Sequence, residues 1–337
     1  AADVTFSGYG RFGVMYSGSV DATGTAGQIT AAEATATASA AAATAAAATV
    51  TANTAAGTLT GADIAAAVTA AATAAADAAA VDAINGADSS TDITSRLRLI
   101  IDANAESDAG VTFGAMVRIQ QGEGERGMTN GARFYARSGG LEVGAGNIWG
   151  ALESMPGQYP VDMGLTGLGY DYVAYAGGGA DAYTSRGLGT SGANGIEVMY
   201  SAGDFAAHIS ASDTNDRIAA YGAYTFSGWT VALGVQDSNL ASDTELTASV
   251  GGTIGPVGVG LAYSDNGTNG DVWVLSGSFD VGAATNIEAY YADDEFKDES
   301  YGVDFNHDLG GGTSLRGGVV SRFGGQTQAD FGIRFNF

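Results

Sequence analysis

Six arginines in the first half of the chain, and four acids in one long segment, are the side chains best placed to act on a ligand. Each arginine is on the polar side of a stretch that alternates polar and apolar residues: Arg11, Arg96, Arg98, Arg118, Arg133 and Arg137. The acids fall within 148–194: Glu153, Asp162, Asp171 and Asp181. Guanidinium and carboxylate groups lining one cavity act through their electric field, which attracts ions and orders water. Alternatively, the arginines are structural and pair with carboxylates such as Glu142 and Glu197.

Patterns that would support catalysis are weak. Gly8-x-Gly10-x-x-Gly13 matches a dinucleotide-binding fingerprint, but that motif must open a helix and here it lies inside an alternating stretch. The only histidines are His208 and His307, and no Gly-x-Ser-x-Gly elbow occurs. We therefore expect no enzyme activity and no required cofactor.

The charge is strongly negative, with 37 Asp and Glu against 13 Lys and Arg and a formal net charge of −24. A nucleic-acid binder would carry a basic patch or stripe, so we expect no nucleic-acid partner. The clustered acids Asp293, Asp294 and Glu295 could hold calcium through oxygen ligands. Solvated surface charge is the alternative for them.

The alternating stretches predict strands, and the clearest is the last, 329–337. Its apolar face is bulky and its other face is polar, with Asp330, Arg334 and Asn336. The apolar face meets either a soluble core or lipid. With 53 Gly, 28 Phe and Tyr, no Cys and a mean hydropathy of only +0.08, composition favours lipid. Because no stretch has the ~20 strongly apolar residues of a membrane helix, such a chain must cross a membrane with strands.

Short and long connections alternate along the chain. Short turns are predicted near 108, 139, 203, 227, 255, 281 and 309. Longer connections are predicted at 18–92, 121–131, 148–194, 212–217, 236–244, 264–271, 293–299 and 322–328. Seven short and eight long connections join sixteen strands, and an even count with long loops on one side is typical of bacterial outer-membrane barrels. The sequence therefore predicts an all-β fold, a single sixteen-stranded antiparallel transmembrane barrel over 1–337.

The first long connection, 18–92, differs from the rest in composition. Alanine makes up 31 of the 60 residues from 31 to 90. Alanine is the best helix former, and Thr30-x-x-Glu33 and Thr60-x-x-Asp63 have the spacing of capping boxes. With a break from Asn53 to Gly57 and a stop at Asn85-Gly86, we expect two Ala-rich helices; a disordered tether is the alternative.

Several segments resemble Gram-negative general diffusion porins of the alphaproteobacterial type. They are 4–16, 94–98, 221–226, 289–293 and the terminal Phe337. The likeness covers 2–17 and 93–337, whereas 18–92 departs from a family whose first loop is usually short.

The resemblance implies a homotrimer of sixteen-stranded barrels, each constricted by its third loop, here 148–194, whose acids would face the six arginines. It implies passive passage of small hydrophilic solutes and ions through a water-filled pore. It places the chain in the outer membrane of a Gram-negative bacterium, in contact with lipid and lipopolysaccharide. It also implies that the outer-membrane assembly machinery, which is thought to recognise a C-terminal Phe, binds Phe337. No signal peptide precedes Ala1, so we expect the mature form. There are two alternatives to a general diffusion porin. One is a substrate-specific channel, and the other is a barrel-anchored adhesion protein that displays the Ala-rich loop.

Overall fold

A computed structural model describes residues 2–123, 127–175, 194–239, 241 and 243–337. The chain divides into two compact units. One unit comprises residues 1–17 and 91–337, and the other comprises residues 18–90.

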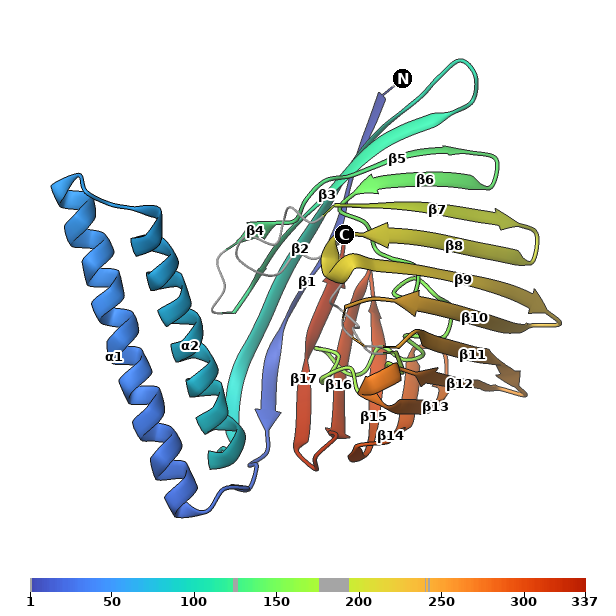
Figure 1. The fold of residues 1–337 in the computed structure, drawn as a ribbon. Helices are drawn as coiled ribbons and strands as arrows, with labels where there is room; N and C mark the ends of the chain where they lie inside the picture. The colour runs from blue at the N-terminus through green and yellow to red at the C-terminus, as the bar shows by residue number, and fades with distance from the viewer. Residues whose placement is uncertain (1, 124–126, 176–193, 240, 242) are drawn as a thin grey trace. The chain divides into compact units, whose positions relative to one another are not determined.

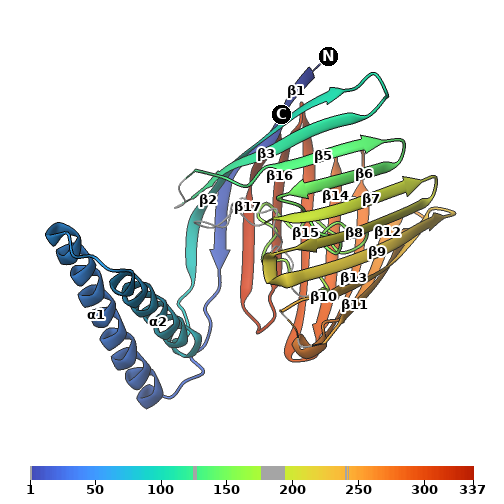
Figure 2. The ribbon, with the colours of Figure 1, turned by 45° about the horizontal axis from the view of Figure 1, so that its top comes forward.

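The first unit is a closed antiparallel β-barrel (Figures 1 and 2). Its strands are β1 (Ala2–Ser17), β2 (Ser90–Glu106), β3 (Thr112–Gly122), β4 (Met128–Thr129), β5 (Arg133–Ser138), β6 (Leu141–Gly146), β7 (Gly195–Ala202), β8 (Phe205–Ser212), β9 (Arg217–Phe226), β10 (Trp229–Asp237), β11 (Glu245–Ile254), β12 (Val257–Asp265), β13 (Asp271–Val281), β14 (Thr285–Asp294), β15 (Lys297–Gly310), β16 (Thr313–Ser321) and β17 (Thr327–Asn336). β4 and β5 both pair with β3, at different positions along it, so together they occupy one strand position in the sheet. Among the described residues, sixteen strand positions therefore form the ring, which closes where β1 pairs with β17 and β2.

The connections lie where they were predicted, but their lengths alternate less strictly: β8 and β9 are joined by four residues, 213–216, whereas β2 and β3 are joined by five, 107–111. The segment 293–299 was predicted as a long connection, but β14 ends at Asp294 and β15 begins at Lys297. Phe296 N donates to Asp294 Oδ1 and Lys297 Nζ pairs with Asp294 Oδ2, so this side chain closes a tight turn. The prediction of a long connection was wrong here, because the Asp294 side chain stabilises a tight turn.

Strand register sorts side chains between the lumen and the outer surface. β17 pairs with β1 so that Arg334 is opposite Arg11, and Ile333 is opposite Phe12. Arg334 contacts lumen groups, whereas Phe12 is 54% exposed on the outside. Large apolar side chains are exposed on this outer face around the whole ring, as a lipid-facing surface requires.

The two faces predict very different costs for substitutions at neighbouring positions. Replacing Ile333 with Arg should lower the free energy of unfolding by up to about 2–4 kcal/mol, because it places a charge in lipid. Arg334→Gln should cost less than about 1 kcal/mol, because its ion pair is partly solvated. Urea unfolding in lipid vesicles, followed by Trp fluorescence, measures both. Equal losses would contradict the register.

The second unit contains, within the described residues, the helices α1 (Ala26–Ala56) and α2 (Gly61–Asn85), which pack on each other (Figure 1). Thr60 and Asp63 form the predicted capping box of α2, and Gly57 ends α1 in the left-handed conformation. The predicted box at Thr30 was wrong: α1 starts one turn earlier, at a box formed by Thr25 and Gln28. Thr30 instead donates its hydroxyl to Ala26 O inside the helix. Neither helix is long and apolar enough to cross a membrane.

The two ends of this second unit meet, which makes its removal testable. Val20 and Ala87 exchange backbone hydrogen bonds of 2.8 and 2.9 Å. Replacing 21–86 by a two-residue Asn-Gly turn should therefore close a hairpin and leave a folded, heat-resistant barrel. Circular dichroism and gel mobility before and after boiling check this outcome. Loss of the β-type spectrum would show that the barrel needs the helices.

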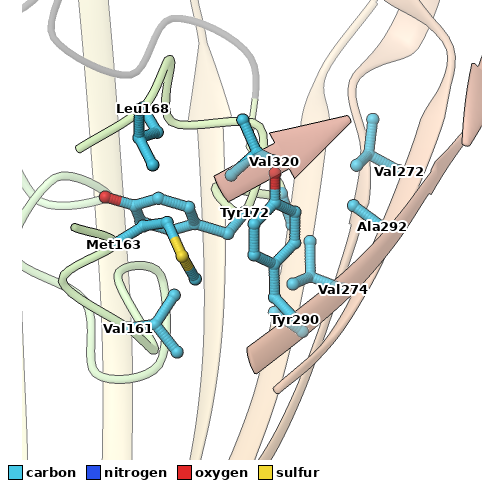
Figure 3. Packing of buried hydrophobic residues seen from close by; sticks show 11 residues of the cluster. Val161, Met163, Leu168, Tyr172, Val272, Val274, Tyr290, Ala292 and Val320 are labelled. Atoms are coloured by element: carbon cyan, nitrogen blue, oxygen red, sulfur yellow. The ribbon is translucent and has the colours of Figure 1, made fainter. Parts of the chain in front are cut away.

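The barrel's apolar core lies between its inner wall and the connection from β6 to β7. Tyr172, Met163 and Leu168 of this connection pack against wall residues such as Val274 and Tyr290 (Figure 3). Tyr172 is 1% exposed and contacts the Tyr290 ring edge-on at 5.5 Å. A second cluster packs Leu152, Met155 and Tyr175 against small residues of β9 and β10: Ala219, Ala223 and Ala232. Apolar burial thus fastens this connection to the lumen side of the wall.

Candidate functional site

The connection between β6 and β7, described over 147–175 and hereafter called the inner loop, is also held by polar contacts with the wall. Ala151 N donates to Ser210 Oγ at 2.8 Å, and Gln158 Nε2 donates to Thr247 Oγ1 at 2.7 Å. Asn266 Nδ2 donates to Ala174 O at 3.1 Å. The contacts reach β8, β11 and the end of β12, so the inner loop crosses the lumen face of several strands.

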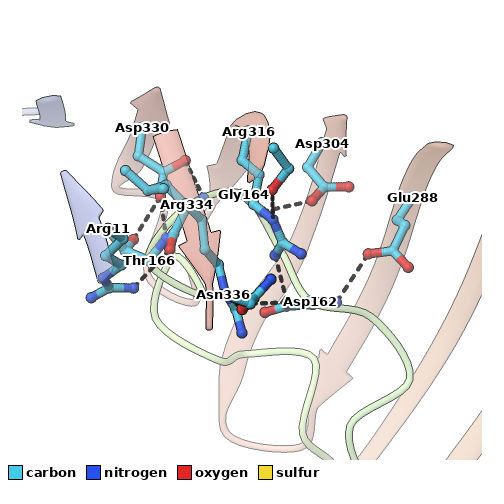
Figure 4. Close-up of polar contacts among 12 residues, drawn as sticks. Arg11, Asp162, Gly164, Thr166, Glu288, Asp304, Arg316, Asp330, Arg334 and Asn336 are labelled. Atoms are coloured by element: carbon cyan, nitrogen blue, oxygen red, sulfur yellow. Dashed lines mark hydrogen bonds and ion pairs between the residues drawn. The ribbon is translucent and has the colours of Figure 1, made fainter. Parts of the chain in front are cut away.

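Two aspartates of the wall form a carboxylate clamp on the turn at Gly164–Thr166 (Figure 4). Asp304 Oδ2 accepts from Gly164 N at 2.7 Å. Asp330 accepts from Leu165 N at 2.9 Å, and from the Thr166 N and Oγ1 atoms at 2.7 Å each. Gly164 has a φ of +61°, and a Cβ there would collide with the Asp330 carboxylate. Buried backbone donors thus meet buried carboxyl oxygens that accept their hydrogen bonds.

The acids of the inner loop meet arginines from the last strands of the barrel. Asp162 Oδ2 lies 2.5 Å from Arg316 Nη1 and 3.1 Å from Arg334 Nη1 (Figure 4). Its side chain is 61% exposed, so it presents charge to the lumen. Asp171 is instead buried and pairs with Arg322 at 2.7 and 2.8 Å. Of these two acids, Asp162 is therefore the one that solutes can reach.

Glu153 is occupied by tyrosines of the same loop. Its Oε2 atom accepts hydrogen bonds from the hydroxyls of Tyr159 and Tyr175. Burial, with a further contribution from the Glu153 carboxylate, raises the pKa of Tyr175 well above its usual range. The fourth predicted acid, Asp181, lies outside the described residues.

All six predicted arginines lie on the lumen face of the barrel, but in three different settings. Arg98 lies over the Tyr9 ring at 5.3 Å, Arg334 lies over the same ring at 4.4 Å, and both Arg96 and Arg11 are near it. The guanidinium of buried Arg11 also donates to Leu165 O of the inner loop at 2.7 Å. Four guanidinium groups thus form a basic patch, the Tyr9 patch: Arg11, Arg96, Arg98 and Arg334.

The other arginines have partners in or beside the wall. Arg118 is 5% exposed and lies over the Trp149 ring at 5.3 Å. Arg133 pairs with Glu142 and Glu197 at 2.6 Å each, which is the structural alternative stated above. Arg137 lies over the Tyr135 ring at 5.2 Å. The predicted facing of inner-loop acids and first-strand arginines is therefore not a direct pairing, because Asp162 and Asp171 pair with Arg316, Arg322 and Arg334.

Comparison with known families decides how this lumen should be interpreted. The model of the Gram-negative porin family matches residues 30–325. The chain belongs to this family. A porin of Fuscovulum blasticum is 33% identical over 283 residues, which are 73% of this chain and 92% of that protein. A porin of Rhodobacter capsulatus is 26% identical over 283 residues, covering 72% and 93% of the two chains.

Solved structures agree with the fold. An engineered variant of the Rh. blastica porin superposes with a TM-score of 0.72 at 24% identity, covering 99% of this chain and 100% of that one. The porin described here is therefore an outer-membrane channel for the diffusion of small hydrophilic solutes and ions, and not an enzyme. The Gly8-x-Gly10-x-x-Gly13 pattern accordingly lies within β1 and opens no helix.

The residues that hold the inner loop carry no distinctive sequence signal. Arg316, Asp304 and Asp330 each occupy a lumen-facing position in the alternation of their strand. That alternation was the only available signal, and it cannot tell a wall residue that touches the loop from one that faces water. Arg322 follows β16 and has no such pattern.

The three acids predicted as calcium ligands have different partners. Asp293 accepts from Trp273 Nε1 at 2.9 Å, and Glu295 accepts from Asp271 N at 3.2 Å. Asp294 pairs with Lys297 at 2.7 Å. Within the described parts of the chain, no group of three or more His, Cys, Asp or Glu side chains is arranged to hold a metal ion. Calcium at this turn gains no support from the geometry and stays a prediction.

Proposed function

We propose that the inner loop forms the narrowest section of the pore and that charge on its two sides sets ion selectivity. The observation that carries the proposal is the carboxylate clamp, because Asp304 and Asp330 hold the Gly164–Thr166 turn on the lumen side of the wall. A loop held against the wall reduces the cross-section of the water-filled pore, whereas a loop released from the wall would leave the pore wider.

The charges at this section are unevenly distributed. Asp162 is exposed at the inner loop, and the Tyr9 patch gathers four arginines on β1, β2 and β17. The two sets of charges touch, because Arg334 of the Tyr9 patch pairs with Asp162. A solute passing beside them crosses a field directed from the guanidinium groups to the carboxylate. Such a field orders water and disfavours apolar solutes that cannot replace it.

The proposal extends to partners. The exposed apolar outer face suits outer-membrane lipid and lipopolysaccharide, and the family resemblance suggests a homotrimer. Phe337 is 53% exposed at the end of β17, where the assembly machinery could bind it. The helices α1 and α2 would be carried by the first long loop on the extracellular side, as the alternation of long and short connections implies.

Conductance measurements test the function directly. In planar bilayers we expect stable open channels, and in liposome swelling we expect a rate that falls smoothly with solute size. Saturable passage of a single solute would instead support a specific channel. A protein that inserts but stays silent would support an anchoring role.

A further inference from the structure

A second, separate site lies on the lumen wall close to the short turn that joins β5 to β6. It is a pocket of about 520 Å³, within the range of small-molecule sites. None of the described inner-loop residues, 147–175, lines it. Its lumen-facing lining includes Thr112, Arg137, Glu142, Met199, Ser201 and Tyr221.

Strand register places the charged residues of this pocket side by side. Arg137 on β5 is directly opposite Glu142 on β6, and Glu142 is opposite Met199 on β7. The same row continues through His208 to Tyr221 on β9. Directly opposed residues in a sheet have Cβ atoms about 5 Å apart. The pocket thus presents a cation, then an anion, then an apolar side chain.

Arg137 is not neutralised by its neighbour. Among the described residues its guanidinium has no carboxylate within ion-pair distance, and it is supported only by the Tyr135 ring at 5.2 Å. The reason is that Glu142 turns to Arg133, whose Nη2 lies 2.6 Å from Glu142 Oε1. Arg137 is exposed and lines the pocket.

Glu142 in turn shares its cation with a second acid. The single guanidinium of Arg133 is divided between Glu142 and Glu197. Buried His208 contacts the other Glu197 oxygen, Oε2, at 3.0 Å. Glu142 Oε2 has no hydrogen-bond partner among the described residues and is available to a ligand.

We propose that this pocket binds a zwitterionic α-amino acid. Its carboxylate would pair with Arg137, its ammonium with Glu142, and its side chain would lie along Met199 and Tyr221. A simple anion would gain the ion pair with Arg137 but would be repelled by the Glu142 carboxylate. A simple cation would gain the ion pair with Glu142 but would be repelled by the Arg137 guanidinium. Both charges are partly solvated, so binding is weak and delays a passing solute without closing the channel. The proposal does not depend on whether the inner loop constricts the pore.

Methyl NMR of the whole porin in detergent, labelled at its methionine methyl groups, tests the site. Met199 reports on the pocket and is assigned by the signal lost in Met199→Leu. Met116, on β3 and opposite Arg133, is the reference outside the pocket. The probes are L-leucine, 4-methylpentanoate, which lacks the ammonium, and 3-methylbutylamine, which lacks the carboxylate. We expect a saturable Met199 shift with L-leucine at millimolar concentration, and about tenfold weaker binding of the other two.

Variants locate the binding groups. Arg137→Gln and Glu142→Gln should each weaken L-leucine binding by about tenfold, and Arg137→Lys by less. Arg98→Gln, in the Tyr9 patch, should leave it unchanged. If 4-methylpentanoate binds as well as L-leucine, the pocket is an anion site and the proposal is overturned. No saturable Met199 shift with L-leucine, or an equal shift of Met116, would also overturn it.

Discussion

Replacing Asp330 with alanine should release the inner loop from the wall and raise single-channel conductance. The substitution removes the acceptor for three donors, Leu165 N, Thr166 N and Thr166 Oγ1. Each buried donor left unpaired costs about 1–3 kcal/mol, so the loop loses much of its attachment while the strands keep their ladder. Planar-bilayer recordings, with limited proteolysis of the loop in detergent, measure the effect.

Asp280→Ala provides the matched control for Asp330→Ala. Asp280 is a lumen-facing acid near the end of β13 that accepts a hydrogen bond from Asn286 Nδ2, and it has no hydrogen bond to inner-loop residues 147–175. Its loss changes the lumen charge by the same amount, so conductance should stay near the wild-type value. An Asp330→Ala channel that conducts like this control and resists protease would show that the clamp does not hold the loop.

Neutralising charges at the proposed narrow section should move ion selectivity in opposite directions. Asp162→Asn should shift the reversal potential toward anions, because Arg316 and Arg334 then lose their carboxylate. Replacing Arg96, Arg98 and Arg334 together by Gln should shift it toward cations. These groups act within the ~8–10 Å screening length, whereas acids of the outer loops are screened by salt. We expect the wild type to prefer cations mildly, because its acidic mouth concentrates them.

Asp171→Asn distinguishes the effect of local charge on ion selectivity from the effect of the net charge of the protein. It removes the same charge as Asp162→Asn, but from a buried ion pair with Arg322. We expect lower stability of the loop and little change in reversal potential under a salt gradient. If Asp171→Asn and Asp162→Asn shift the potential equally, net charge governs selectivity. If neither Asp162→Asn nor the triple arginine variant shifts it, the assignment of the narrow section is wrong.

The sequence alone determined the barrel, the facing of its side chains and the helices of the insertion. Alternation is a local property of an extended chain, so it assigned Arg11, Arg98 and Arg334 to the lumen without knowledge of any partner. Helix formation in the Ala-rich segment is likewise local, and Thr60, Asp63 and Gly57 marked its limits. The count of connections supplied the strand number, and composition indicated the membrane.

Only the tertiary structure decided which charges meet. Asp162 pairs with Arg316, 154 residues away, and Asp330 binds a turn 164 residues earlier in the chain. Alternation assigns a residue to one face of its strand, but it does not determine which residues of that face the inner loop contacts. The loop's position follows from apolar burial of Tyr172 and from carboxylates that satisfy its backbone donors. For the same reason the pocket at Arg137 could not be predicted, because it depends on Glu142 turning away to Arg133.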